Sequence, residues 1–117
     1  MVEGPLFYSV HVLAEEQYED MFEAAEVIAE RVRAIGQLAP WSLEWLSEQS
    51  VITSPKQAPT AGEMIQEFAA DHERVAHRLH ALMELSGKPD PVTEDLGVAR
   101  AAFHEKAAWM LRALGRE

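Results

Sequence analysis

The chain has 117 residues, of which 48% are hydrophobic, and 20 Asp and Glu against 10 Lys and Arg give a formal net charge of −10. This length fits a single domain over 1–117, and the hydrophobic content excludes an intrinsically disordered chain. Since cysteine is absent, disulfide scaffolds, thiol catalysis and cysteine–zinc sites are excluded. No apolar run approaches the roughly 20 residues of a membrane-spanning helix, and the N-terminus has no secretory signal pattern. We therefore expect a cytoplasmic protein that does not contact membranes.

The first predicted element is a long helix over 6–36. Apolar residues recur at spacings of three and four, the period of one helix face: Phe7, Val10, Ala14, Tyr18, Met21, Ala25, Ile28, Val32 and Ile35. A Gly-Pro pair precedes this pattern and Gly36 ends it. Such a helix would span about 45 Å, which is longer than most helices of globular proteins.

A short helix is predicted over 40–47, in the connection that follows. Pro40 suits a first helical position, and Trp41 and Trp45 would lie on one side of the helix. Residues 49–59 contain the Ser, Thr and Pro residues of a loop. Bulky aromatic residues in a connection that ought to be polar indicate an interface, so we expect an oligomer.

Two more long helices complete the predicted fold. The segment Thr60–Glu63 has the spacing of a capping box and would open a helix over 60–86. Asp90 followed by Pro91 supplies an N-cap and a first helical residue for a helix over 91–115. The predicted fold class is all-α, a bundle of three long antiparallel helices with a short helix in a crossover connection.

Most of the histidines are expected to be structural or surface residues, because a histidine on a helix usually has such a role. His72, His77 and His80 stand among charged residues, on what the sequence pattern suggests is a solvated face. His104 is expected at the surface or at an interface. The sequence contains neither an HExxH zinc motif nor the Glu-x-x-His pair of four-helix di-iron sites.

His11, Glu26 and Glu30 form a different pattern. The two glutamates are four residues apart, so both carboxylates project from one helix face and could bind one cation. His11 stands about 22 Å away along the same helix, so one chain cannot bring all three onto one ion. If two such helices pair antiparallel about a two-fold axis near residue 19, His11 of one chain meets both glutamates of the other. Alternatively, the glutamates are ordinary solvated charges, with Glu30 pairing locally to Arg33.

Several motifs follow one another along the chain: Gly4-Pro-Leu-Phe-Tyr-Ser-Val-His11, Glu26-Val-Ile-Ala-Glu30-Arg31, Gly36, Asp71-His-Glu, Thr93-Glu-Asp95-Leu and His104-Glu-Lys-Ala-Ala-Trp-Met-Leu111. In this order they resemble the Dps (DNA protection during starvation) branch of the ferritin-like superfamily. The resemblance covers essentially the whole chain. The steps from His11 to Glu26 and on to Glu30 match the family's ferroxidase pattern.

The resemblance implies a function as well as a ferritin-like fold. Members of the family store iron in a hollow shell of twelve four-helix subunits, and they oxidise Fe(II) with hydrogen peroxide or oxygen at sites shared across a two-fold interface. It implies that this chain is a ferroxidase for iron storage and stress protection, with His11, Glu26 and Glu30 as metal ligands. The short helix with Trp41 and Trp45 would lie at the dimer interface.

Acidic residues also begin the last helix. Asp90, Glu94 and Asp95 match the region where the family places iron-entry pores, although a helix N-terminus favours acidic residues in any case. The family name carries a DNA-binding role too. Twelve subunits of charge −10 would carry −120 formally, with no basic tail to offset repulsion by phosphate. The sequence therefore argues against direct DNA binding.

Two features depart from the family pattern. Glu26 stands where most members have an aspartate, which keeps the oxygen ligands but adds a methylene. Members also have a helix before the Gly-Pro turn, ending in a His-Trp pair upstream of where Met1 falls, and each site would lose that imidazole. The start could be truncated or misassigned, another polypeptide could supply the helix, or a three-helix form could assemble differently. The alternative function is therefore a non-catalytic helical assembly that has lost a complete ferroxidase site.

Overall fold

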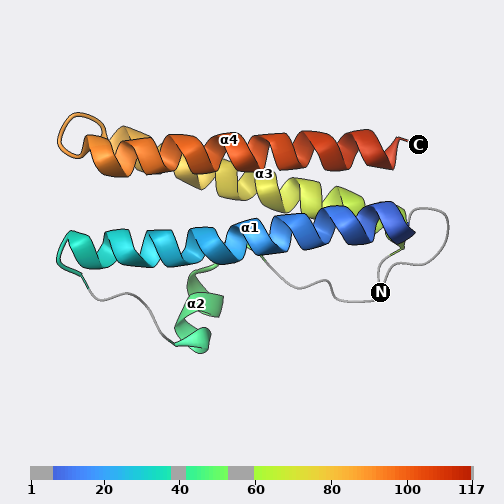
Figure 1. Cartoon of the computed structure of the whole chain (residues 1–117), viewed down its shortest axis with the longest axis horizontal. Helices are drawn as coiled ribbons and strands as arrows, with labels where there is room; N and C mark the ends of the chain where they lie inside the picture. The colour runs from blue at the N-terminus through green and yellow to red at the C-terminus, as the bar shows by residue number, and fades with distance from the viewer. Residues whose placement is uncertain (1–6, 38–41, 53–59, 117) are drawn as a thin grey trace.

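A computed structural model of the chain describes residues 7–37, 42–52 and 60–116. Within these ranges the chain forms four helices, drawn in Figure 1: α1 (Phe7–Ala34), α2 (Leu43–Gln49), α3 (Ala61–Ser86) and α4 (Pro91–Gly115). The predicted all-α fold is confirmed, and each helix begins and ends within three residues of its predicted bounds. Trp41 lies outside the described residues. No helix in these ranges is both long and apolar enough to cross a membrane.

The helix ends follow from local side-chain chemistry. At the start of α3, the Thr60 hydroxyl accepts a hydrogen bond from the Glu63 N–H, and the Glu63 carboxylate accepts one from the Thr60 N–H, both at 3.2 Å. These two bonds are the predicted capping box. Asp90 caps α4 by accepting from the Thr93 N–H at 3.1 Å. After α1, Gly36 has a φ of 93°, a left-handed conformation that ends the helix at little cost.

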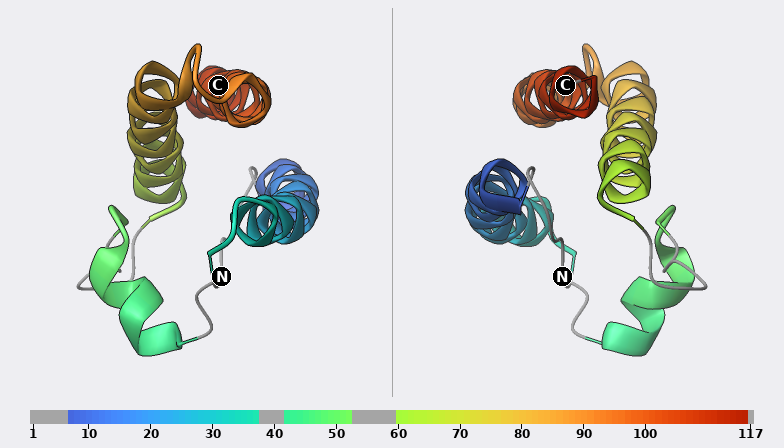
Figure 2. Two further views of the ribbon diagram at one scale, coloured as in Figure 1. Left: turned by 90° about the vertical axis from the view of Figure 1, so that its left-hand side faces the viewer. Right: turned by 90° about the vertical axis from the view of Figure 1, so that its right-hand side faces the viewer.

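The direction of the helices depends on the connection that contains α2. This connection returns the chain to the end of the bundle where α1 began, so α1 and α3 run in the same direction and α4 runs antiparallel to both (Figure 1). Along the bundle axis the three long helices occupy three corners of a square (Figure 2). α2 lies on the side of α1 and α3 that faces away from α4.

The core is small and lies between α3, α4 and the first half of α1. Its buried members come from all three helices: Val10, Ile65, Ala69, Ala108 and Leu111. α3 and α4 approach closely because small residues face the opposite helix. At Gly97 of α4, an added Cβ would stand only 3.1 Å from the Met83 side chain of α3. The close α3–α4 pair therefore forms the base on which α1 rests.

α1 buries a different stripe from the one that its apolar pattern predicts. Val10 and Gln17 are buried, and Leu13 packs against the core. Tyr18, which the pattern places in the apolar stripe, is 64% exposed. The arc of apolar residues on α1 is broad, so periodicity alone does not decide which part of the arc faces α3 and α4.

Large apolar side chains remain exposed on each long helix: Tyr8, Tyr18, Phe22, Val27, Leu85, Val92, Val98 and Trp109. A single chain therefore leaves apolar surface uncovered. Exposed apolar surface of this extent is typical of interaction sites.

Candidate functional site

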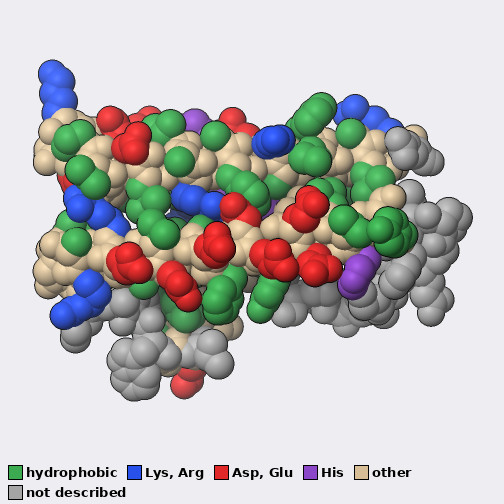
Figure 3. Space-filling model, in the orientation of Figure 1, with side chains coloured by type: hydrophobic (Ala, Val, Ile, Leu, Met, Phe, Trp, Pro, Cys, Tyr) green, Lys and Arg blue, Asp and Glu red, His purple; other side chains and the backbone are tan. Residues whose placement is uncertain are grey.

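The outer face of α1 is acidic. Its exposed glutamates are Glu15, Glu16, Glu19, Glu23, Glu26 and Glu30. Asp and Glu side chains gather along this helix on the face shown in Figure 3. Taking roughly 100° per residue, Glu26 lies opposite the buried Gln17 on the helix circumference. The carboxylates therefore point away from α3 and α4.

The three predicted iron ligands all lie on α1. Glu26 and Glu30 are exposed and one turn apart, and His11 is exposed near the other end of the helix. The Nε2 atom of His11 lies 3.7 Å from the Glu15 carboxylate. In the described residues, no group of three or more His, Cys, Asp or Glu side chains is placed to hold a metal ion. One chain thus does not bring the three ligands together, in agreement with the helix arithmetic, and their meeting across two chains stays a prediction.

The acidic residues at the start of α4 have different surroundings. Asp90 accepts hydrogen bonds from the N–H and the hydroxyl of Thr93, and its Oδ1 lies 2.7 Å from the Arg31 guanidinium. Thr93 first, and then Arg31, hold the pKa of Asp90 below its ordinary value. Asp90 therefore ties the end of α1 to the start of α4. Glu94 is half-buried and Asp95 is exposed, and the pore role of all three residues stays a prediction.

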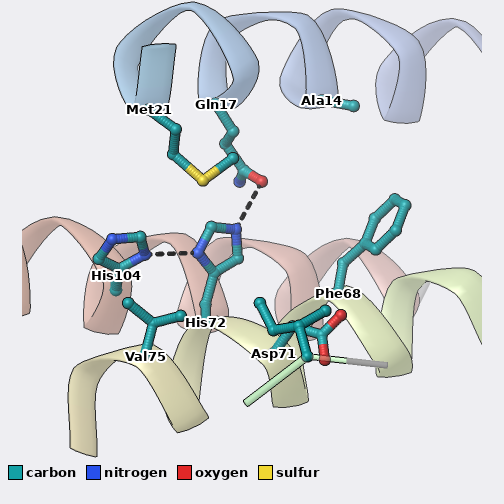
Figure 4. A pocket seen from close by; sticks show the side chains of 9 residues that line it. Ala14, Gln17, Met21, Phe68, Asp71, His72, Val75 and His104 are labelled. Carbon is teal, nitrogen blue, oxygen red and sulfur yellow. Dashed lines mark hydrogen bonds between the residues drawn. The ribbon is translucent and has the colours of Figure 1, made fainter. Parts of the chain in front are cut away.

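A chain of hydrogen-bonded polar side chains crosses the three long helices, and Figure 4 shows Gln17, His72 and His104 of it. His72 on α3 and His104 on α4 are 7% and 5% exposed, and their Nδ1 atoms lie 2.8 Å apart. The Nε2 of His72 lies 2.9 Å from the Gln17 Oε1 on α1. The Nε2 of His104 lies 3.2 Å from the Arg100 guanidinium, which also donates to Asp20 on α1 at 2.6 Å. We call these five residues the buried chain, after its buried middle part, although the Asp20 side chain at one end is 40% exposed.

The protons of the buried chain can be assigned from one end. Arg100 can only donate, so the Nε2 of His104 accepts, and its Nδ1 carries the proton. That Nδ1–H donates to the Nδ1 of His72, whose Nε2–H in turn donates to the Gln17 carbonyl oxygen. Both imidazoles are neutral in this arrangement. Burial, followed by the nearby Arg100, lowers the pKa of His104 to about 4, and burial is also the main cause that lowers the pKa of His72.

The predicted surface positions of His72 and His104 are wrong. His77 and His80 are exposed as predicted, and His80 pairs with Glu105 at 2.8 Å. The missed signal was helical phase: each buried histidine stands three residues after one buried alanine and four residues before another. These alanines are Ala69 and Ala76 on α3, and Ala101 and Ala108 on α4. The charged neighbours in sequence obscured this phase.

A cavity of about 210 Å³ lies beside the buried chain, between α1 and α3. Figure 4 shows Met21, Phe68 and Val75 around it, together with Gln17 and the two histidines. The side-chain nitrogen of Gln17 is buried and has no hydrogen-bond partner among the described residues. A cation between the two Nδ1 atoms would have to displace the proton they share, and it would stand near a guanidinium. The arrangement therefore suits neutral imidazoles better than a metal ion.

Comparisons with known proteins agree with this architecture. The family model of the ferritin-like domain matches residues 1–117. A low-temperature-induced protein of Nostoc is 35% identical over 114 residues, which is 95% of this chain but only 64% of that protein. DNA protection during starvation protein 2 of Bacillus anthracis is 34% identical, over 96% of this chain and 77% of its own length. The crystal structure of Dps from Staphylococcus aureus superposes with a TM-score of 0.91 at 29% identity, covering 96% of this chain and 76% of that one.

Proposed function

Because the chain belongs to the Dps (DNA protection during starvation) family of ferritin-like proteins, we propose that it binds Fe(II) and oxidises it to Fe(III), as an iron-storage protein that protects against oxidative stress. The observation that carries the proposal is the acidic outer face of α1. Glu26 and Glu30 stand there one turn apart, exposed and directed away from the bundle. They are therefore available to a second chain.

Two copies of the chain would complete each iron site. At roughly 100° per residue, His11 lies only about 60° around α1 from Glu26, so both belong to the outer face. An antiparallel pair of α1 helices about an axis near residue 19 places His11 of one copy beside Glu26 and Glu30 of the other. The two-fold axis then generates two identical sites.

The chemistry of these ligands suits iron oxidation. Carboxylate oxygens and an imidazole nitrogen bind Fe(II), and hard carboxylates favour the harder Fe(III) still more, so the site assists loss of the electron. With hydrogen peroxide as oxidant, two Fe(II) ions supply the two electrons that convert one peroxide and two protons to two waters. Oxygen is the alternative oxidant. Compared with the aspartate of most family members, Glu26 keeps both carboxylate oxygens, but its extra methylene shifts their position.

Self-association follows from the same proposal. Trp45 on α2 is 49% exposed, and it would lie at the dimer interface with Trp41. A shell of such dimers would enclose the stored iron, with Asp90, Glu94 and Asp95 near its entry pores. Because Arg31 already neutralises Asp90, we assign the attraction of cations there mainly to Glu94 and Asp95.

Anaerobic Fe(II) titration tests the site. The Glu26→Ala/Glu30→Ala double variant should lose Fe(II) binding, whereas wild-type protein binds it. The matched control is Glu67→Ala/Glu84→Ala, which removes the same charge from exposed positions on α3. The site is supported if the control variant binds Fe(II) like wild type and the Glu26→Ala/Glu30→Ala variant does not bind it. Unchanged stoichiometry in the first variant removes it.

A non-catalytic assembly is the second candidate function. It is favoured by the exposed apolar surface of the long helices. Iron-dependent consumption of oxygen or peroxide distinguishes the two candidates, since an assembly without the site consumes neither. The net charge of −10 argues against direct DNA binding in both cases.

A further inference from the structure

We propose that the buried chain of Gln17, His72, His104, Arg100 and Asp20 sets the rotation of α1 about its own axis, and thereby aims the outer face of α1 at its partner. These five are positioning residues and do not touch the metal. The link to iron rests on the proposed function, whereas the control of helix rotation stands on the contacts alone.

Polar contacts are needed to fix the rotation of α1, because its apolar residues allow more than one face of the helix to pack against α3 and α4. The stripe predicted by apolar spacing contains Tyr18, whereas the stripe facing the bundle contains Gln17 and Asp20. At roughly 100° per residue, the centres of the two stripes differ by about 60°. Hydrophobic burial is non-directional and does not by itself select between them.

The rotation determines where the proposed ligands point. A 60° turn of α1 would move the Glu26 and Glu30 carboxylates sideways on the order of 5 Å, given the radius of a helix with its side chains. Ligand-to-metal bonds are near 2 Å and tolerate little error, so a shared site would be lost. The polar contacts on the inner face therefore control the geometry of the opposite face.

The buried chain is specific because each link has one direction. Arg100 contributes donors only, and this forces every proton position from His104 through His72 to Gln17. If α1 turned, the His72 Nε2–H would lose its acceptor and Arg100 would lose Asp20. Buried donors without acceptors are costly, so the observed rotation is favoured over the alternative.

Acid should open the buried chain. Gln17 of α1, Asp71 of α3, and His104 and Arg100 of α4 surround His72; Arg100, His72 and Asp20 surround His104. A proton added to His72 would place two N–H groups opposite each other at the 2.8 Å contact between the Nδ1 atoms. A proton added to His104 would direct its Nε2–H at the Arg100 guanidinium, which can only donate. Burial opposes this protonation at neutral pH. The hydrogen bonds between these five residues therefore persist at neutral pH and are lost as the pH falls.

The first test uses the wild-type protein and needs no metal. Two-bond ¹H–¹⁵N histidine spectra at pH 7 report which ring nitrogen carries the proton. We expect His104 protonated at Nδ1 and His72 at Nε2, both neutral. A His72 ring protonated at Nδ1, or a charged imidazole in either residue, would overturn the proposed chain.

The second test uses Gln17→Met, which keeps side-chain length but removes the acceptor. Its α1 amides should exchange at least tenfold faster with solvent at pH 7 while α3 and α4 keep their protection. The control is Gln66→Met, the same change at an exposed position on α3. Equal protection of α1 in both variants refutes the role of Gln17.

An anaerobic Fe(II) titration then connects the rotation to the metal. Gln17→Met should bind Fe(II) at least tenfold more weakly than wild type, and Gln66→Met like wild type. If Gln17→Met binds as tightly as wild type, the aiming role is wrong while the proposed function stands. If wild-type protein binds no Fe(II), the proposed function fails, and the proton positions with the amide exchange still decide the control of rotation.

Discussion

His72 and His104 share one proton between Nδ1 atoms 2.8 Å apart, at the point where α3 and α4 meet the inner face of α1. Their outer ring nitrogens complete the link, one to Gln17 and the other to Arg100. A contact of this kind tolerates only one proton between its two facing nitrogens. The stability of the bundle is therefore coupled to pH.

The free energy of unfolding should fall as the pH is lowered from about 6.5 towards 4. In the folded chain the pKa of His104 is about 4 and that of His72 is lowered, whereas both return to about 6.5 on unfolding. Between these values the unfolded chain binds more protons, so the stabilisation is fully present above pH 6.5 and is lost in acid. Denaturant unfolding at a series of pH values measures the slope. His104→Gln should flatten it, and the exposed-site control His77→Gln should leave it unchanged.

Replacing the Gln17 amide by a carboxylate should raise the pH at which the contact between His72 and His104 is lost. Gln17→Glu places a negative charge beside the His72 Nε2, which favours the imidazolium and raises the pKa of His72. An NMR titration of the ring should give a His72 midpoint higher than in wild type. The same spectra should show the His104 contact disrupted at a higher pH. A His72 midpoint equal to that of wild type would mean that residue 17 does not contact this ring.

The compact α3–α4 pair should carry most of the core stability. Leu111 is 1% exposed, and Leu111→Ala should destabilise the protein by about 3 kcal/mol through lost burial and a residual cavity. Leu85 is 82% exposed, so Leu85→Ala should change stability by less than about 0.5 kcal/mol. Denaturant midpoints of the two variants provide the comparison. Similar losses in both would contradict the burial pattern.

Much of this fold could be predicted from local chemistry. The Asp90-Pro91 pair and the Thr60–Glu63 segment encode helix starts, and the predicted helices begin where these caps lie. Such signals act within one helical turn, so they need no knowledge of the tertiary structure.

The rotation of α1 and the burial of two histidines could not be obtained in the same way. Apolar spacing favoured the Tyr18 stripe, but contacts with residues distant in sequence favour the Gln17 stripe. Charged neighbours suggested a solvated face for His72, although its phase with Ala69 and Ala76 pointed inwards. The spacing of Glu26 and Glu30 gave a candidate half-site, and its completion depends on a second chain that one sequence does not describe.

Mixing two inactive variants tests the central claim, that each iron site is shared between two chains, most directly. His11→Ala and Glu26→Ala/Glu30→Ala should each bind little Fe(II) alone. The two variants are mixed at equal ratio, unfolded, refolded together and titrated anaerobically. Random pairing makes about half of the dimers heterodimers, and each heterodimer has one of its two sites intact, which restores about a quarter of the wild-type sites overall. Recovery near that fraction is the predicted result. No recovery, with heterodimers present by native mass spectrometry, would contradict a site shared between chains.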